Sequence, residues 1–128
     1  MSTSLTSKRV VLLVEDDEPL RAALVDALKL LGYRVHEAEN GTVALDVAAV
    51  VQEPIDLVIS DYVMPGISGL ELYEALRSGG YAGKFLIITG YSIPKAVQSD
   101  AAYAGVVWSK KPISVSRLRR TLARILEE

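Results

Sequence analysis

Residues 10–32 read VVLLVEDDEPLRAALVDALKLLG, and this stretch contains the signals that decide the fold. The five apolar residues 10–14 form a continuous run, which is typical of a strand covered on both faces. After an acidic turn, four leucines repeat at helical spacing: Leu20, Leu24, Leu28 and Leu31. Pro19 and Gly32 bracket this repeat, as expected for the first turn and the C-terminal cap of a helix. The stretch therefore predicts a buried strand followed by an amphipathic helix.

The same alternation continues along the rest of the chain. Short apolar or alternating runs predict further strands at 33–37, 57–60, 85–88 and 105–108. Helical periodicity predicts helices over 42–51, 70–77, 93–104 and 115–126, of which 93–104 has the weakest pattern because it contains Pro94 and mostly alanine. Strict alternation indicates a parallel sheet with helices on both faces. Because the run 33–37 suits an edge strand, we expect a doubly wound α/β fold with strand order 2-1-3-4-5.

Composition limits the classes of protein that need considering. The 128 residues suit one domain, and 14 Lys+Arg against 16 Asp+Glu give a net charge of −2, which argues against a dedicated nucleic-acid binder. The absence of cysteine excludes disulfides, thiol catalysis and Cys-ligated metals, and one histidine, His36, excludes a multi-His metal site. No apolar run reaches the roughly 18 residues that span a bilayer. Residues 1–7 are polar, so we expect a short disordered lead, a single domain over 8–128 with no output domain, and a cytoplasmic location.

Polar side chains follow four of the predicted strands where each strand ends. They are Glu15, Asp16 and Asp17, then Asp61, then Thr89, then Lys111. Open α/β sheets bind ligands at this edge, and the first and third strands flank the point where the strand order reverses. Carboxylates that converge there repel one another unless a cation intervenes, and Mg²⁺ is the simplest oxygen-liganded choice. With a lysine and a hydroxyl added, the set is typical of a phosphoryl-transfer site.

Four motifs in order resemble the receiver domain of two-component response regulators. They are VLLVEDDEPLR (11–21), VISDYVMPGISG (58–69), LIITG (86–90) and WSKKP (108–112). The separations are 45 residues from Asp16 to Asp61, 28 to Thr89 and 22 to Lys111, and the resemblance covers about 8–126. It implies a flavodoxin-like (βα)5 fold.

The resemblance also implies roles for the acidic residues. Asp61 matches the aspartate that accepts a phosphoryl group from a phosphohistidine on a sensor kinase. Glu15 and Asp16 match the acidic pair that binds Mg²⁺ together with Asp61, and the backbone carbonyl of Val63 faces the metal. Asp17, by contrast, is expected only to cap the first helix.

Further roles follow from the same resemblance. Lys111 matches the lysine that contacts the phosphoryl oxygens, and the Lys111-Pro112 bond is usually cis in the family. Thr89 matches the switch hydroxyl, and Trp108 stands where the family usually carries a switch Tyr or Phe. A plain core residue is the alternative for Trp108. Val63 and Tyr91 stand where the family tunes the access of hydrolytic water.

We therefore expect a phospho-accepting receiver that signals by protein–protein contact and is not an enzyme beyond its own phosphoryl uptake and loss. Its partners would be a sensor histidine kinase or a histidine phosphotransfer protein, and a downstream protein bound through the fourth helix, fifth strand and last helix, without contacts to nucleic acid or membrane. The arginines of the last helix form a solvated or partner-facing side. One alternative is the receiver module of a hybrid sensor kinase. Another is a Mg²⁺-dependent aspartyl-phosphate phosphohydrolase, which usually carries D-x-D where this chain has Glu15-Asp16-Asp17.

Overall fold

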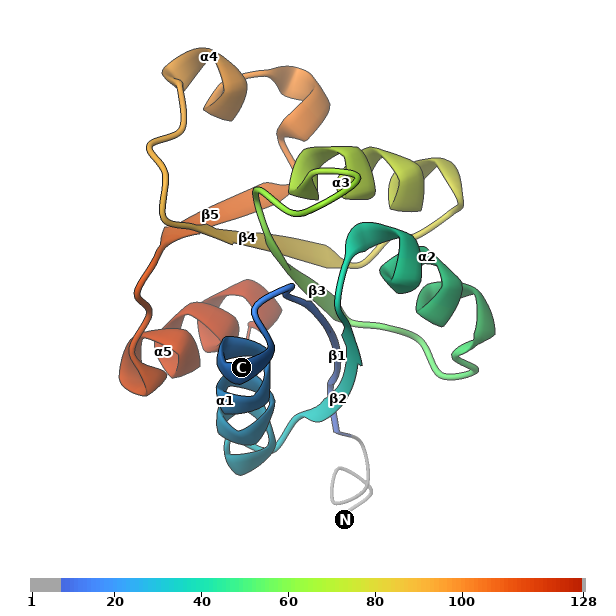
Figure 1. The fold of residues 1–128 in the computed structure, drawn as a ribbon, viewed down its shortest axis with the longest axis vertical. Helices are drawn as coiled ribbons and strands as arrows, with labels where there is room; N and C mark the ends of the chain where they lie inside the picture. Colours follow the sequence, from blue (N-terminus) through green and yellow to red (C-terminus); the bar gives the residue numbers. More distant parts are fainter. Residues whose placement is uncertain (1–7, 128) are drawn as a thin grey trace.

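The computed structural model describes residues 8–127, which fold around a five-stranded parallel sheet of order β2-β1-β3-β4-β5 (Figure 1). The strands are β1 (Val10–Val14), β2 (Arg34–Ala38), β3 (Leu57–Asp61), β4 (Lys84–Thr89) and β5 (Val106–Lys110). The helices are α1 (Glu18–Leu30), α2 (Gly41–Val50), α3 (Gly69–Ser78), α4 (Lys95–Gln98) and α5 (Val115–Leu126). The doubly wound order predicted from the sequence is confirmed. The expected disordered lead over 1–7 lies outside the described residues.

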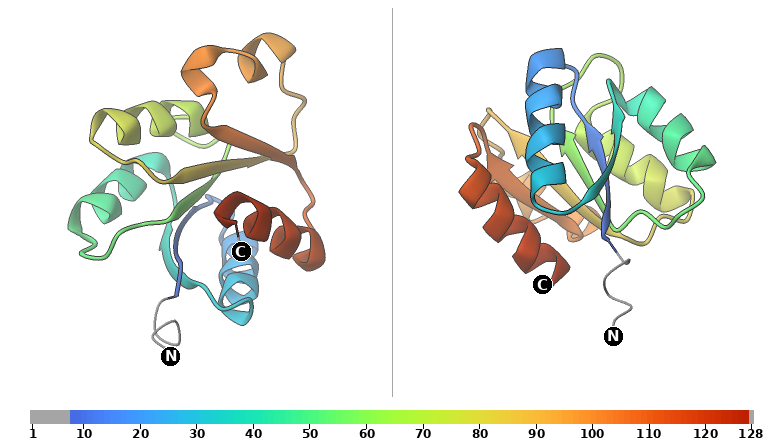
Figure 2. Two further views of the ribbon diagram at one scale, coloured as in Figure 1. Left: turned by 180° about the vertical axis from the view of Figure 1, so that it is seen from behind. Right: turned by 90° about the horizontal axis from the view of Figure 1, so that it is seen from below.

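Two apolar layers enclose the sheet. Helices α1 and α5 cover one face, and α2 and α3 cover the other (Figure 2). The first core includes Leu28 of α1 and Leu122 of α5, and the second includes Leu72 of α3 and Phe85 of β4, all fully buried. Both faces of β1 are buried along its whole length, which explains its continuous apolar run.

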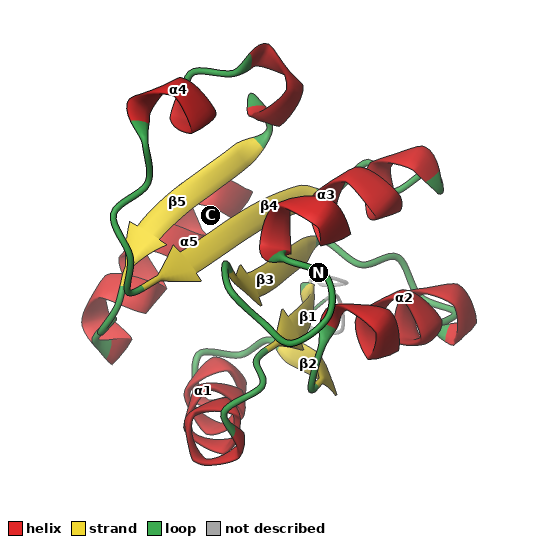
Figure 3. Ribbon diagram, turned by 45° about the horizontal axis from the view of Figure 1, so that its top comes forward, coloured by secondary structure: helices red, strands yellow, loops and turns green. Residues whose placement is uncertain are grey.

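The helix predicted over 93–104 is wrong as a single element. The chain instead forms the four-residue α4 and a separate 3-10 helix, Ala101–Tyr103, on the α3 side of β5 (Figure 3). The Ser99 hydroxyl donates to the Lys95 carbonyl (2.7 Å) and Asp100 accepts from the Ala102 N–H (2.9 Å), so side chains end one turn and begin the next. Neither piece contains a buried residue, so core packing does not hold the segment in one helix.

The other helices begin at side-chain caps. Asp17 accepts from the Leu20 N–H at the start of α1, as predicted, and Asn40 caps α2. Ser68 forms a capping box with Glu71 at the start of α3, and Ser114 caps α5. These caps fix where each helix leaves the edge of the sheet that carries the polar residues. None of the helices within 8–127 is long and apolar enough to cross a membrane.

Candidate functional site

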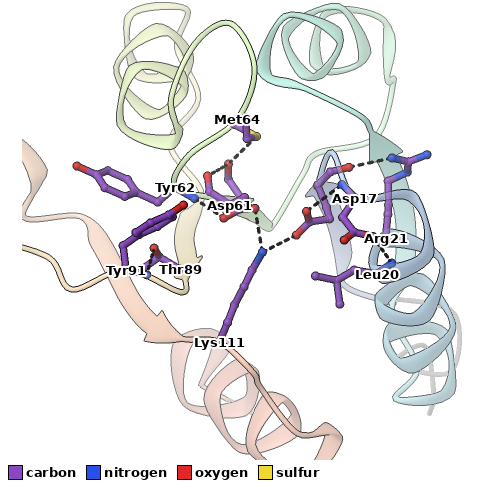
Figure 4. Close-up of polar contacts among 11 residues, drawn as sticks. Asp17, Leu20, Arg21, Asp61, Tyr62, Met64, Thr89, Tyr91 and Lys111 are labelled. Atoms are coloured by element: carbon purple, nitrogen blue, oxygen red, sulfur yellow. Dashed lines mark hydrogen bonds and ion pairs between the residues drawn. The ribbon is translucent and has the colours of Figure 1, made fainter.

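The polar strand-end residues meet in one open depression at the carboxyl edge of the sheet. It has a volume of about 700 Å³, and its lining includes Glu15, Asp16, Asp61, Val63, Tyr91 and Lys111. Asp61 is the last residue of β3, and Lys111 directly follows β5. The doubly wound order brings these positions together because parallel strands end at the same edge. Figure 4 shows Lys111 reaching across the depression toward Asp61.

Lys111 connects two carboxylates at once. Its Nζ lies 2.9 Å from Asp61 Oδ2 and 3.2 Å from Glu15 Oε1. Burial opposes the charge of the ammonium, but the hydrogen bonds and negative charges of Asp61 and Glu15 outweigh that effect, so the pKa of Lys111 is raised. Lys111 is therefore a fixed cation between the first and third strands. The bond that follows it, Lys111-Pro112, is cis, as expected.

Glu15 is the most deeply buried acid of the site, with only 3% of its surface exposed. Its Oε2 accepts from the Asp17 N–H at 3.1 Å. Burial raises the pKa of Glu15, the Asp17 N–H lowers it, and the charge of Asp61 raises it further, so the net shift is upward despite Lys111. The negative charge of Glu15 is thus held at a cost in the absence of a metal ion.

Arg21 supports the same residue and was not singled out in the sequence. Its guanidinium donates to the Glu15 carbonyl at 2.8 Å and to Glu37 Oε1 at 3.1 Å (Figure 4). The only sequence signal is its place on the first turn of the helix that follows the acidic run. Arg21 fixes the backbone from which the Glu15 side chain projects.

The donor set suits a hard divalent cation. Glu15, Asp16 and Asp61 each offer a carboxylate oxygen, and these oxygens all lie within 4.8 Å of one another. Asp16 is exposed at the rim, whereas Asp17 turns to the α1 N-terminus. Oxygen ligands of this kind, with room left for water and a phosphoryl oxygen in an open depression, are what Mg²⁺ requires. The residues present therefore fit a magnesium site.

The loop after Asp61 holds this carboxylate in place. The Tyr62 N–H donates to Asp61 Oδ1 at 2.9 Å, and the Gly69 N–H donates to the Tyr62 carbonyl at 2.8 Å. A Cβ on Gly69 would lie 2.5 Å from the Asp61 carbonyl oxygen, so only glycine allows the start of α3 to pack this close. The Asp61 side chain keeps 12% of its surface exposed, and its Oδ2 contacts only Lys111.

The remaining predicted residues line the outer side of the site. Thr89, at the end of β4, is 1% exposed, and its Oγ1 accepts from the Tyr91 N–H at 3.0 Å. It does not cap α4, whose N-cap has no side-chain hydrogen bond. Tyr91 and Val63 are 63% and 52% exposed over the depression. Trp108 lies away from Lys111 on β5 and packs edge-on against Tyr62, with ring centroids 5.6 Å apart.

Comparisons with known proteins agree with this geometry. The model of the response regulator receiver domain matches residues 11–123. Sensor kinase CckA of Brucella abortus is 35% identical over 99% of this chain, which spans 13% of the length of that kinase.

Two solved structures are similar over nearly the whole fold. Chemotaxis protein CheY4 of Vibrio cholerae has a TM-score of 0.85 at 30% identity, covering 94% of this chain and 100% of that one. The response regulator TrrA of Thermotoga maritima, solved with Mg²⁺ and BeF, has a TM-score of 0.78 at 31% identity, covering 92% and 99%. The chain thus belongs to the response regulator receiver domain family, the phospho-accepting modules of two-component signalling.

Proposed function

We propose that Asp61 is the phosphoryl acceptor of this receiver. The observation that carries the proposal is the position of its carboxylate, which is held by the Tyr62 N–H on one oxygen and by the Lys111 ammonium on the other, beside Glu15 and Asp16. A carboxylate oxygen of Asp61 attacks phosphorus, the phosphorus–nitrogen bond of the donor phosphohistidine breaks, and the imidazole nitrogen keeps the electron pair. Catalysis of this step comes from positioning and charge neutralisation.

Each neighbouring side chain has a role in that transfer. Glu15, Asp16, Asp61 and the Val63 carbonyl would hold Mg²⁺, which neutralises charge on the phosphoryl oxygens when it is bound. Lys111 exchanges its carboxylate contacts for a phosphoryl oxygen, because the acyl phosphate places that oxygen where Asp61 Oδ2 lies. The Thr89 hydroxyl donates to another phosphoryl oxygen and moves the end of β4 toward the site. Trp108 follows this movement and changes the face formed by α4, β5 and α5.

Two exposed side chains set the lifetime of the acyl phosphate. Val63 and Tyr91 flank the depression that Asp61 opens into. An apolar and an aromatic side chain there restrict the approach of water to phosphorus. Loss of the phosphoryl group is then slow, and Tyr91→Ala accelerates it in a time course of intact mass.

The biological setting follows from this chemistry. The phosphoryl donor is a sensor histidine kinase or a histidine phosphotransfer protein in the cytoplasm, and the response passes to a downstream protein through α4, β5 and α5, without contact to nucleic acid or membrane. The chain acts as a signalling module over 8–128 and not as an enzyme on other substrates. It works alone or as the receiver module of a hybrid sensor kinase, an arrangement supported by the similarity to CckA.

Intact mass spectrometry after incubation with a small phosphodonor tests the acceptor. Wild-type protein with Mg²⁺ is expected to gain one phosphoryl group that hydroxylamine or mild alkali removes, since an acyl phosphate is a mixed anhydride. Asp61→Asn is expected to gain none, and Asp17→Asn, which alters a neighbouring acid outside the acidic cluster, keeps the uptake. Stoichiometric, hydroxylamine-labile uptake by Asp61→Asn would falsify the assignment.

A further inference from the structure

Helix α5 carries a stripe of positive charge along its solvent side. Arg117, Arg120 and Arg124 recur at spacings of three and four, which places them on one helical face away from the buried Leu118 and Leu122. All three are exposed, and none forms an ion pair with a carboxylate of the described residues. Arg120 instead donates to the Ser116 hydroxyl at 3.1 Å. The stripe is therefore unneutralised, although the whole chain is acidic.

A groove continues from this stripe across β5 toward α4. Its volume is about 350 Å³, and its lining includes Arg117 and Lys110 as cations and Tyr91 and Trp108 as aromatic walls. No carboxylate lines it. An anionic group in the groove would meet two cations and no opposing charge, so the electrostatics favour negative ligands.

The strand below the groove has two donors without acceptors. The indole Nε1 of Trp108 and the hydroxyl of Ser109 are buried and form no hydrogen bond. Buried donors are normally satisfied, so these two mark a place where an acceptor is missing. The adjoining α4 has no buried residue, and a segment held so weakly can move to admit one.

We propose that the arginine stripe (Arg117, Arg120 and Arg124) and the adjoining groove bind an acidic segment of a partner protein, whose glutamate or aspartate side chains pair with the guanidinium groups. Planar guanidinium groups bind carboxylates through two parallel hydrogen bonds, and such a segment also brings backbone carbonyls for the unpaired donors. A DNA duplex or an anionic membrane is a broader polyanion, and the exposed Asp16, Asp17 and Glu18 at the same edge of the sheet would repel it. This inference rests on the proposed function, because phosphorylation would reshape the groove through Thr89 and Trp108.

Fluorescence anisotropy of a short fluorescein-labelled, glutamate-rich peptide tests the surface on the full chain, with and without phosphodonor and Mg²⁺. The glutamine version of the peptide is expected not to bind. Arg117→Gln is expected to weaken binding about tenfold, the effect of one lost charge-assisted hydrogen bond. Arg119→Gln removes an equal charge from the same helix but from another face, and is expected to change the affinity less than about twofold.

The outcomes separate this inference from the proposed function, because phosphoryl uptake is measured by intact mass in the same samples. Peptide binding that depends on Arg117 more than on Arg119 supports the inference, whether or not Asp61 takes up the phosphoryl group. Uptake without peptide binding in either state overturns the inference and leaves the proposed function standing. Equal losses in the two variants, or binding of duplex DNA or anionic phospholipid vesicles as tight as that of the peptide, also overturn it.

Discussion

Lys111 and Glu15 set the charge balance of the site at the residue scale. The ammonium stands between Asp61 and Glu15, while the third acid, Asp16, projects into solvent. Without a divalent ion, one lysine therefore faces three carboxylates of the cluster. Variants of the acidic run should consequently differ according to which carboxylate they remove.

Asp16 and Asp17 offer a matched pair for metal binding. Asp16→Ala removes an oxygen of the acidic cluster and is expected to weaken Mg²⁺ binding by at least about tenfold in a calorimetric titration. Asp17→Ala removes the α1 cap, so it is expected to cost about 1 kcal/mol of stability with little change in Mg²⁺ affinity. Equal losses of Mg²⁺ affinity would mean that the metal ligands are shifted by one residue.

Glu15 should make stability depend on pH in the metal-free protein. Its pKa is raised above the ordinary value of 4.5, so the folded state binds the proton more tightly than the unfolded state. The stabilising contribution is present below that ordinary value and is lost as pH rises through the higher folded value. Glu15→Gln cannot ionise, so its melting temperature relative to wild type is expected to rise from acidic to neutral pH.

The control for this measurement is Glu39→Gln, an exposed glutamate outside the acidic cluster. Thermal melts in chelator at both pH values give the comparison. A wild type that gains stability over Glu15→Gln toward neutral pH would contradict the upward shift in the pKa of Glu15.

At the scale of elements, α4 and the 3-10 helix differ from the rest of the molecule. Helix α5 buries Leu118, Leu122, Ile125 and Leu126, whereas α4 buries none of its residues. The hydroxyl of Tyr103 donates to Glu74 at 3.2 Å, and its ring packs edge-on near Tyr73, which ties the 3-10 helix to α3. The segment is thus fastened at its far end and weakly held where it borders Thr89 and Trp108.

The movement of this region can be followed through Trp108, the only tryptophan. Adding phosphodonor and Mg²⁺ to wild type is expected to shift its emission, because β4 is drawn toward Asp61 and the contact between Trp108 and Tyr62 changes. Thr89→Ala lacks the hydroxyl that draws β4 and is expected to lose most of the shift while keeping phosphoryl uptake. Asp61→Asn serves as the control and should show no shift. The same shift in Thr89→Ala as in wild type would break the proposed coupling.

For the whole molecule, stability depends on the two apolar layers packed against one sheet. Because β1 and β3 are buried on both faces, each layer supports the other through the strands that also carry Glu15 and Asp61. The site residues can therefore be charged and partly exposed without loss of the fold.

Two leucines on helices provide the test of this division. Leu122→Ala empties a fully buried position in the α1/α5 layer and is expected to lower the free energy of unfolding by about 2–5 kcal/mol. Leu30→Ala makes the same chemical change at a side chain that is 86% exposed, and is expected to cost less than about 0.5 kcal/mol. Urea denaturation measures both, and similar losses would contradict the assignment of Leu122 to the core.

The sequence by itself determined the number, type and order of the strands and most of the helices. Those features follow from local periodicity and from caps such as Asp17 and Gly32, each of which acts within a few residues of chain. It also determined that Asp61, Thr89 and Lys111 would share an edge, because parallel strands necessarily end on the same side.

The tertiary structure alone decided how these residues touch. The bridge from Lys111 to Glu15 spans 96 residues, and nothing in the local pattern around Arg21 indicates its bond to the Glu15 carbonyl. The break after α4 and the unpaired indole of Trp108 likewise depend on what packs against them. Periodicity records which way a side chain faces, whereas contact, burial and charge at a site depend on distances between segments that only folding brings together.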